Sequence, residues 1–366
     1  MTALLPAAPP LFAPEERSLC LKPRSFDDLA GFGADDHLEA FKVFRQSCTA
    51  IAAKAAPLRQ GPPASAALEA IAHAALRPEI ANSAQARRFF ETHFRPFHVA
   101  AKGHALEGNG FLTGYYEPIV AGSLTQTRDF AAPVLARPDN LDGLAPYPER
   151  AEIEASGIEG HTRPIVWLRD RVEVFLIQVQ GSARVRLADG RIMRLVYDGR
   201  NGQPYTSIGR ILIESGEITE ADMSLAALKQ WIRAHGQNPG EAGLALMQRN
   251  QSYVFFALDG TTDPLAGPIG GQGIGLSTLR SIAVDRTIWP YGSPFWIDAK
   301  LPWQSGTVSA FRRLMIAQDT GSAIVGPARV DIFFGSGDDA GARAGDIRHA
   351  GEVIVLLPAG EGRTGE

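Results

Sequence analysis

Two aspartates near the C-terminus stand at the ends of apolar segments and are well suited to chemistry. The segment RLMIAQ runs into Asp319, and Asp331 lies within a second apolar segment, between Arg329 and Phe334. Burial favours the neutral form of a carboxyl group, so such positions tend to raise its pKa. A carboxylic acid that keeps its proton near neutral pH can act as a general acid. The spacing therefore predicts a reactive site, whereas the simpler alternative is a pair of aspartates that cap turns.

Other residues point to the kind of ligand such a site would take. A third acid, Asp285, again follows an apolar run, Ile282 to Val284. Tyrosines offer flat faces with hydroxyls, and other side chains offer amides and hydroxyls; they are Tyr115, Tyr116, Tyr197, Tyr205, Gln180, Ser182, Asn201 and Gln203. This inventory suits a neutral, hydroxyl-rich ligand such as a sugar chain better than a phosphate or a metal.

Composition and rival motifs exclude several other classes of protein. The chain has 366 residues, 45% of them hydrophobic, and a net charge of −4, so it lacks the basic footprint of a nucleic-acid-binding protein. Cys20 and Cys48 cannot form a disulfide framework. The GSGDDA segment places two acids where a dinucleotide pyrophosphate would sit. His-Glu-x-x-His and Gly-x-Ser-x-Gly motifs are absent. We expect no metal or nucleotide cofactor.

Periodicity predicts helices first and strands afterwards. Apolar residues recur with helical spacing over residues 38–51, 64–76 and 83–94, and Asp35 and Asp36 are candidate caps for the first helix. From Phe111 onward, short strands alternate with Gly, Pro and Asp-Gly breaks. Residues 172–179 alternate like a strand, and Asp189-Gly190 predicts a hairpin. A capping pattern at Thr219 and Asp222 precedes a helix that Gly236 closes.

Five segments, in this order, resemble the membrane-bound lytic murein transglycosylase A family with its C-terminal three-aspartate domain. They are GFLTGYYEP, QVQGSARVRLADG, YDGRNGQPYTSIGR, GIGLSTLRSIAVDR and RRLMIAQDTG with VDIFFGSG, and the resemblance covers residues 107 to 358. It implies a mainly β fold with N-terminal helices: a six-stranded double-psi β-barrel with a smaller inserted β domain and a cleft between the two. We expect the barrel and helices in residues 26–120 and 251–366, the insert in 121–250, and a flexible tether in 1–25.

The resemblance also implies a role for each site residue. Asp331 is the expected catalytic acid. Substrate contacts are expected from Asp319, Asp285, Thr113, Tyr115, Tyr116, Glu117, Gln180, Ser182, Asn201, Gln203 and Tyr205. The implied reaction cleaves the β-1,4 bond between N-acetylmuramic acid and N-acetylglucosamine and leaves 1,6-anhydromuramic acid ends. The implied partners are peptidoglycan glycan strands, with cell-wall synthesis or hydrolysis enzymes as further candidates. A monomer in the periplasm, associated with the outer membrane, is expected.

Two alternatives remain at this point. The first is an inverting polysaccharide hydrolase on a similar barrel, with Asp331 as the acid and Asp319 or Asp285 activating water. The second is a cell-wall-binding module whose acids are structural. Because barrels host many functions, fold analogy alone does not separate the three.

Overall fold

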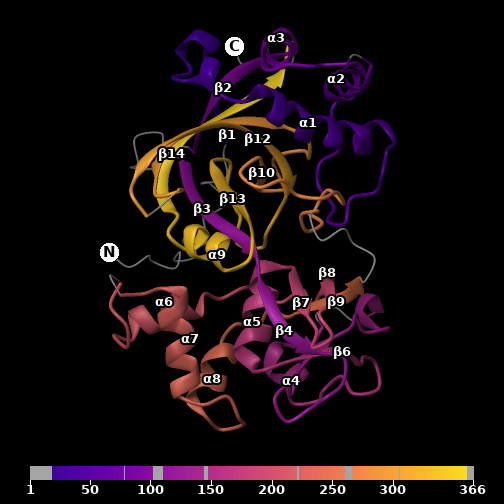
Figure 1. Cartoon of the computed structure of the whole chain (residues 1–366), viewed down its shortest axis with the longest axis vertical. Coiled ribbons are helices and arrows are strands. Elements are labelled where there is room, and N and C mark those ends of the chain that lie inside the picture. The colour runs from indigo at the N-terminus through magenta and orange to yellow at the C-terminus, as the bar shows by residue number, and fades with distance from the viewer. Residues whose placement is uncertain are drawn as a thin grey trace. The chain divides into compact units, whose positions relative to one another are not determined.

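The computed structural model describes residues 19–77, 79–101, 110–143, 147–220, 222–259, 266–304 and 306–360. The chain divides into two compact units. The barrel unit comprises the described parts of Pro9–Tyr115, Ile269–Gly335 and Asp346–Glu366. The second unit comprises those of Tyr116–Pro268 and Ser336–Gly345. Figure 1 labels the helices and strands of both.

Six strands of the barrel unit close on themselves. Their order is β14-β11-β12-β10-β13-β3, and β3 also pairs with β14. Their bounds are Gly110–Glu117 for β3, Ser281–Ala283 for β10, Pro294–Leu301 for β11, Ser309–Asp319 for β12, Arg329–Ser336 for β13 and Arg348–Pro358 for β14. The short β10 lies parallel to β12 and antiparallel to β13. The expected mainly β fold with a six-stranded barrel is confirmed (Figure 1).

Two further strands extend this sheet beside β14. Strand β2 (Phe94–Ala101) pairs with β14, and β1 (Leu19–Pro23) pairs with β2. Residues 1–18 of the expected tether lie outside the described residues. For Leu19–Pro23 the prediction of a flexible tether was wrong, because the backbone groups of these residues pair with β2.

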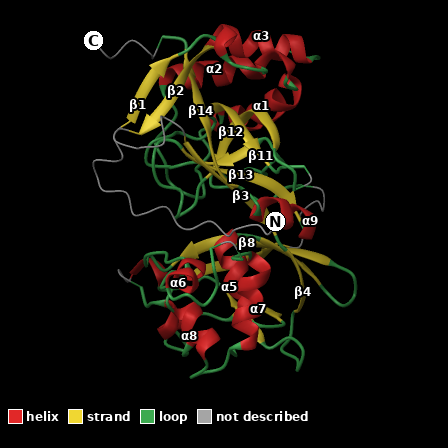
Figure 2. Cartoon of the chain, turned by 90° about the vertical axis from the view of Figure 1, so that its left-hand side faces the viewer, coloured by secondary structure: helices red, strands yellow, loops and turns green. Residues whose placement is uncertain are grey.

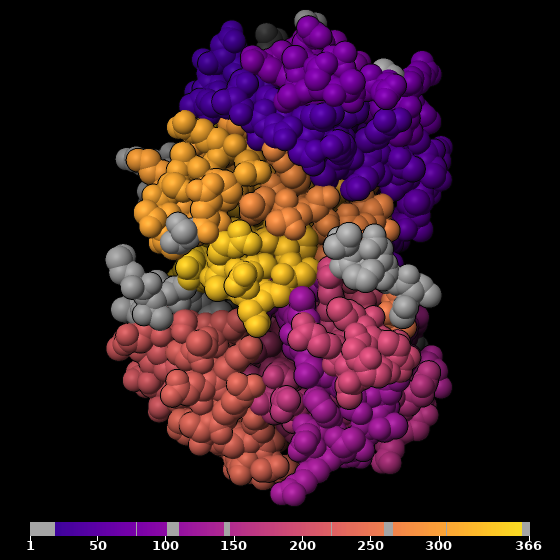
Figure 3. Space-filling view, in the orientation of Figure 1, coloured from indigo at the N-terminus to yellow at the C-terminus, as the bar shows by residue number. Residues whose placement is uncertain are grey.

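Three helices cover the barrel, as predicted. They are α1 (His37–Ala52), α2 (Ala66–Leu76) and α3 (Ser83–His93), and the short 3-10 turns η2 (Phe26–Asp28) and η3 (Phe32–Ala34) precede them. The Asp36 side chain accepts a hydrogen bond from Glu39 N at 3.1 Å, which caps α1 and leaves Asp35 for another partner. Figures 2 and 3 show these helices over the strands β2, β12 and β14 and at the surface of the barrel unit.

Aromatic side chains hold the helices against the barrel. Phe41 and Phe44 of α1 meet Phe89 and Phe90 of α3, with ring centroids 5.1 to 6.2 Å apart. Edge-to-face and tilted contacts at such distances add to the free energy gained from burial alone. The same core continues into the barrel through Trp296, Leu314, Ile316, Ile354 and Leu356.

A buried polar network also joins α1 to the barrel, and we call it the Ser47 network. The Ser47 hydroxyl donates to Gln272 Oε1 at 2.8 Å and accepts from Gln318 Nε2 at 2.9 Å. Gln318 Oε1 in turn accepts from the Ser281 hydroxyl at 2.5 Å. These four side chains are at most 5% exposed, so each bond satisfies a group that water does not reach.

The second unit is built on another sheet, whose strand order is β5-β6-β4-β7-β8-β9. The strands are β4 (Ile119–Ser123), β5 (Ala132–Leu135), β6 (Pro164–Leu168), β7 (Ala183–Arg186), β8 (Ile192–Arg200) and β9 (Val254–Asp259). The helices are η4 (Leu141–Gly143), α4 (Arg150–Glu154), α5 (Arg171–Gln180), α6 (Ile208–Glu214), α7 (Leu225–Ala234), α8 (Ala242–Gln248) and α9 (Asp338–Gly345). The predicted hairpin is confirmed, because β7 and β8 pair antiparallel around Gly190.

The strand predicted over residues 172–179 is wrong, because this segment forms α5. The Asp170 side chain caps its first turn, and Gly181 ends it in the left-handed conformation, with φ +80°. The helix is apolar on two faces. Val174 and Ile177 pack into the sheet core, and Val172 and Phe175 pack among residues of α6, α7 and α8. Burial on both faces gives an almost continuous apolar run, which period alone cannot assign to helix or strand.

The cap predicted for the next helix is also wrong. Helix α7 begins after Ser224, whose side chain accepts from Ala227 N at 3.1 Å. Thr219 instead forms a local turn, in which its hydroxyl oxygen accepts from Asp222 N at 3.2 Å. The Thr219 side chain thus closes a local turn before α7 instead of capping the helix.

Candidate active site

The two acids singled out from the sequence lie on either side of one short strand. Asp319 is the last residue of β12, and Asp331 is the third residue of β13. Both pair in register with Ala283 of β10, Asp319 in the parallel pairing and Asp331 in the antiparallel one. Neighbouring strands are about 4.8 Å apart, so the Cα atoms of Asp319 and Asp331 are separated by roughly two strand spacings.

Asp331 is half-buried and is held by the neighbouring strand β3. Its Oδ1 accepts a hydrogen bond from the Thr113 hydroxyl at 2.6 Å. Burial raises the pKa of Asp331 above its usual range; Arg329 and the Thr113 hydrogen bond act in the opposite direction, and Asp319 adds to the rise. The net effect favours the protonated carboxylic acid, which is the form that a general acid requires.

Asp319 differs, because protein groups hold both of its oxygens. Oδ1 accepts from Gly271 N at 2.7 Å and from Thr320 N at 2.8 Å. Oδ2 accepts from the Tyr115 hydroxyl at 2.9 Å. Burial first, and then Asp319 and Asp331, raise the pKa of Tyr115 well above its usual range, so this tyrosine keeps its proton and remains a donor. Its ring packs on Phe333, with centroids 5.3 Å apart.

The third acid, Asp285, is a structural residue in this geometry. It is 3% exposed. Its Oδ1 accepts from Thr287 N and from the Thr287 hydroxyl at 2.9 and 2.7 Å, and its Oδ2 accepts from Gly326 N at 2.7 Å. These bonds hold the turn after β10 against the loop that leads into β13. Asp285 therefore stabilises the backbone near Asp319 and Asp331.

Glu117 was expected to contact substrate, but it is fully buried in the second unit. One oxygen accepts from Arg194 Nε at 2.7 Å. The other accepts from Arg184 Nε at 2.7 Å and from the Ser336 hydroxyl at 2.6 Å. Both arginines also donate to the carbonyl oxygen of Ala266. We call this group the Glu117 cluster, and its geometry favours a structural role over contact with a ligand.

The remaining polar residues of the sequence inventory lie in the second unit, and two of them are engaged by backbone. Asn201 donates to Pro148 O at 3.0 Å and Gln251 O at 2.8 Å, and Gln203 donates to Tyr147 O at 2.8 Å. These bonds shape the NGQPY segment and give both amides a structural role.

The other five residues differ in burial. Gln180, Tyr197 and Tyr205 are half-buried, whereas Ser182 and Tyr116 are buried. The Gln180 side-chain oxygen accepts from Tyr116 N at 3.2 Å, which places its amide beside the end of β3.

Sequence reasoning missed two groups that the structure places at the acids. Arg329, two residues before Asp331, donates through Nη2 to the Thr113 hydroxyl at 2.8 Å. Gly271 supplies a backbone N–H to Asp319, and a Cβ at this glycine would lie 2.5 Å from the Tyr291 hydroxyl. Gly271 belongs to the glycine-rich segment GGQG, residues 270–273, whose backbone can approach a carboxylate closely.

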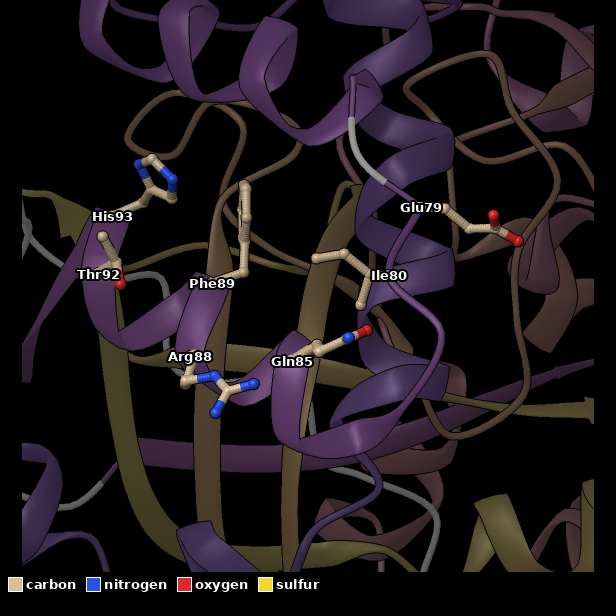
Figure 4. A pocket seen from close by; sticks show the side chains of 7 residues that line it. All are labelled: Glu79, Ile80, Gln85, Arg88, Phe89, Thr92 and His93. Atoms are coloured by element: carbon tan, nitrogen blue, oxygen red, sulfur yellow. The ribbon is translucent and has the colours of Figure 1, made fainter.

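A separate hollow lies on the helical side of the barrel unit. Its volume is about 340 Å³, and Figure 4 shows its lining: Glu79, Ile80, Gln85, Arg88, Phe89, Thr92 and His93. It contains none of the residues expected at the site. Across the described ranges, no three His, Cys, Asp or Glu side chains are grouped so as to hold a metal ion. Within the same ranges, no helix is both long and apolar enough to cross a bilayer.

Two stretches of the chain match known domain families. Residues 111–257 match the MltA specific insert domain, and residues 280–357 match the 3D domain. The membrane-bound lytic murein transglycosylase A of Escherichia coli K12 is 34% identical over 256 residues, which span 69% of this chain and 67% of the relative.

Two solved structures share the fold over nearly the whole chain. A membrane-bound lytic murein transglycosylase from Agrobacterium tumefaciens superposes with a TM-score of 0.80 at 33% identity, covering 92% of this chain and 97% of that one. E. coli MltA with bound chitohexaose gives a TM-score of 0.67 at 26% identity, covering 98% and 95%. The chain therefore belongs to the membrane-bound lytic murein transglycosylase A family, a family of peptidoglycan-cleaving lyases.

Proposed function

We propose that this protein cleaves the β-1,4 bond between N-acetylmuramic acid and N-acetylglucosamine in peptidoglycan, with Asp331 as the single acid and base. The observation that supports this assignment is the contrast between the two acids. Burial raises the pKa of Asp331, whereas both oxygens of Asp319 are occupied by protein donors. One carboxyl group is thus prepared to give and take a proton, and the other to position.

The proposed reaction needs no water. Asp331 protonates the oxygen that links the two sugars, and the bond from C1 of the muramic acid to that oxygen breaks. The carboxylate of Asp331 then takes the proton of the C6 hydroxyl of the same muramic acid. The C6 oxygen attacks C1 and closes a 1,6-anhydro ring. Because the nucleophile belongs to the substrate, orientation contributes a large part of the rate, as it does in other intramolecular attacks.

The residues around the acids receive revised roles. Thr113 and Tyr115 were expected to contact the sugar, yet their hydroxyls donate to Asp331 and Asp319. We therefore assign them to the positioning of the acids. Contacts with the glycan strand remain a proposal for Gln180, Ser182 and Tyr205. The chitohexaose bound to the E. coli relative supports a β-1,4-linked amino-sugar chain as the ligand class.

We further propose that the protein acts on glycan strands in the periplasm, in association with a membrane, as the name of its relatives indicates. We also propose that it acts as a monomer. Cell-wall synthesis or hydrolysis enzymes are its proposed partners.

The mass of the products released from purified murein tests the function. Lytic transglycosylation leaves anhydro ends, which are one water lighter than reducing ends. Reducing ends would instead indicate a hydrolase, and binding without release would indicate a cell-wall-binding module. The assay separates all three because only the first reaction conserves the mass of the strand.

A further inference from the structure

The Thr113 hydroxyl lies between a buried arginine and the proposed catalytic acid. Arg329 Nη2 is 2.8 Å from Thr113 Oγ1, which is 2.6 Å from Asp331 Oδ1. Thr113 is 1% exposed and Arg329 is 5% exposed, so water does not compete for these bonds. The three side chains come from two paired strands, β3 and β13, and form a chain of two hydrogen bonds.

The direction of both bonds follows from the hydrogens available. A guanidinium only donates, so Thr113 Oγ1 must accept from Arg329. The single hydroxyl hydrogen of Thr113 is then free to point at Asp331 Oδ1, which must accept it. An oxygen that accepts this hydrogen at 2.6 Å is a poor place for a second hydrogen in the same direction.

We propose that Arg329 is a positioning residue which, through Thr113, keeps the transferable proton of Asp331 on Oδ2. The proposal rests on the function proposed above, because it specifies which oxygen of the acid reacts. Oδ2 gives the proton to the glycosidic oxygen and later takes the proton of the C6 hydroxyl. Oδ1 stays bonded to Thr113 throughout.

The hydroxyl also separates two charges that would otherwise pair. A guanidinium bonded directly to Asp331 would favour the carboxylate strongly and remove the acid. With Thr113 between them, Arg329 lowers the pKa of Asp331 without overcoming the larger effect of burial. Arg329 is itself fixed by Val330 O at 2.8 Å from Nη1 and by the Phe111 ring, whose centroid is 5.0 Å from its Cζ.

The charged and titratable groups that face Asp331 set the expected pH dependence. They are Arg329 on its own strand, Asp319 on β12 and Tyr115 on β3. Asp319 disfavours the carboxylate, and Arg329 and Thr113 favour it. Removing either of the last two therefore raises the pKa of Asp331. Since the acid must begin protonated, activity should then persist to higher pH while the maximal rate falls.

Four variants test the proposal on purified glycan strands of defined length. Thr113→Val keeps the shape and removes the hydroxyl; Thr113→Ser restores it. Arg329→Met removes the charge and the donors; Arg329→Lys keeps a charge without the fork. For Thr113→Val and Arg329→Met we expect kcat to fall by roughly 10- to 100-fold, the scale of one lost hydrogen bond to a charged group, with KM little changed. Their alkaline limb should move up by about one pH unit. Thr113→Ser should recover most of the rate, and Arg329→Lys should keep the limb near its normal position.

The matched control is Arg280→Met. Arg280 is as buried as Arg329. It is ion-paired with Asp35 at 2.8 Å and makes no hydrogen bond to Asp319 or Asp331. It should lose stability without moving the alkaline limb. A purely structural Arg329 would behave like this control, with an unchanged limb in the folded variant, and that result would overturn the proposal.

A readout independent of activity separates this inference from the proposed function. The Asp331 carboxyl carbon can be titrated by NMR in ¹³C-aspartate-labelled protein and assigned by its loss in Asp331→Asn. A higher pKa of Asp331 in Thr113→Val supports the positioning role of Thr113 and Arg329 even if murein yields no anhydro ends. An unchanged pKa of Asp331 in Thr113→Val overturns that role even if the transglycosylase reaction is established.

Discussion

Asp319 and Asp331 are paired with the same residue, Ala283, from opposite edges of the three-residue strand β10. The shared partner fixes the separation of the two carboxyl groups through backbone hydrogen bonds instead of side-chain contacts. Neither acid can shift along its strand without breaking that register. The difference between them lies in their side chains: protein donors hold both oxygens of Asp319, and Thr113 holds one oxygen of Asp331.

Asp331→Asn should lower activity by at least ~10²-fold, because it removes the transferable proton. The same change should preserve or raise stability at neutral pH. Burial raises the folded-state pKa of Asp331, so the protonated form is favoured on folding. Its contribution to stability is complete below the unfolded pKa of about 3.9 and is lost as pH rises through the folded value. Murein clearance and thermal unfolding at pH 4 and pH 7 measure both effects; near-normal turnover would refute the assignment.

Asp319→Asn should be milder, with a loss of about 10-fold. The amide oxygen can still accept from Gly271 N and Thr320 N, and the bond with Tyr115 is the one that changes. Kinetics and product masses should be measured together. A loss as severe as that of Asp331→Asn, accompanied by reducing ends in the wild type, would identify Asp319 as the base of an inverting hydrolase.

Gly271→Ala should reduce activity by roughly 10-fold by moving a backbone donor away from Asp319. The new Cβ would lie 2.5 Å from the Tyr291 hydroxyl, which is too close, so the loop or the tyrosine must shift. Gly345→Ala is the control, since nothing lies within 4 Å of a Cβ there. Equal activity of the two variants would contradict the proposed role of the Gly271 N–H.

Glu117→Gln should destabilise the protein by about 3–5 kcal/mol, because it leaves Arg184 and Arg194 buried without their counter-charge. Chemical denaturation measures the loss. Glu214→Gln is the matched control in the same unit. It breaks an exposed ion pair with Arg210, so the free energy of unfolding should hardly change. A Glu117→Gln protein of normal stability that binds glycan weakly would restore the substrate-binding role expected from the sequence.

Gln180→Ala should weaken the binding of glycan strands by roughly 3- to 10-fold, the effect of one or two neutral hydrogen bonds. Calorimetry on an Asp331→Asn background avoids cleavage during the measurement. Gln180→Glu separates two roles, because it keeps an acceptor for Tyr116 N and removes the amide donors. If only the alanine variant binds weakly, Gln180 supports Tyr116 and does not contact the sugar.

The strands that carry the acids were predictable because their signals are local. The apolar runs that lead into Asp319 and surround Asp331 are recognisable without knowledge of the rest of the chain; β12 ends at Asp319, and Asp331 is the third residue of β13. Helix α5 was not predictable in this way. Its apolar residues are distributed between two cores, so the periodicity that marks a one-sided helix is lost.

The roles of individual polar residues were harder to predict than the strands. The sequence identifies Glu117, Thr113 and Arg329 as polar residues near the motifs, but burial decides what each can contact. Glu117 is fully buried among cations, and Thr113 is turned toward Asp331. Arg329 received no prediction, because an arginine beside an apolar strand is ordinarily expected in solvent. Partners from β3, more than 200 residues earlier, determine its role.

The Ser47 network makes the helical layer part of the frame that holds the acids. Ser47 of α1 bonds to Gln272 and Gln318, and each of these is one residue from a group at the site, Gly271 or Asp319. Local unfolding of α1 would therefore expose unpaired amides and release Asp319 in the same event. Slow hydrogen exchange of the α1 and β12 amides should accordingly report one cooperative opening, with a shared free energy, that also limits how long the site survives heating.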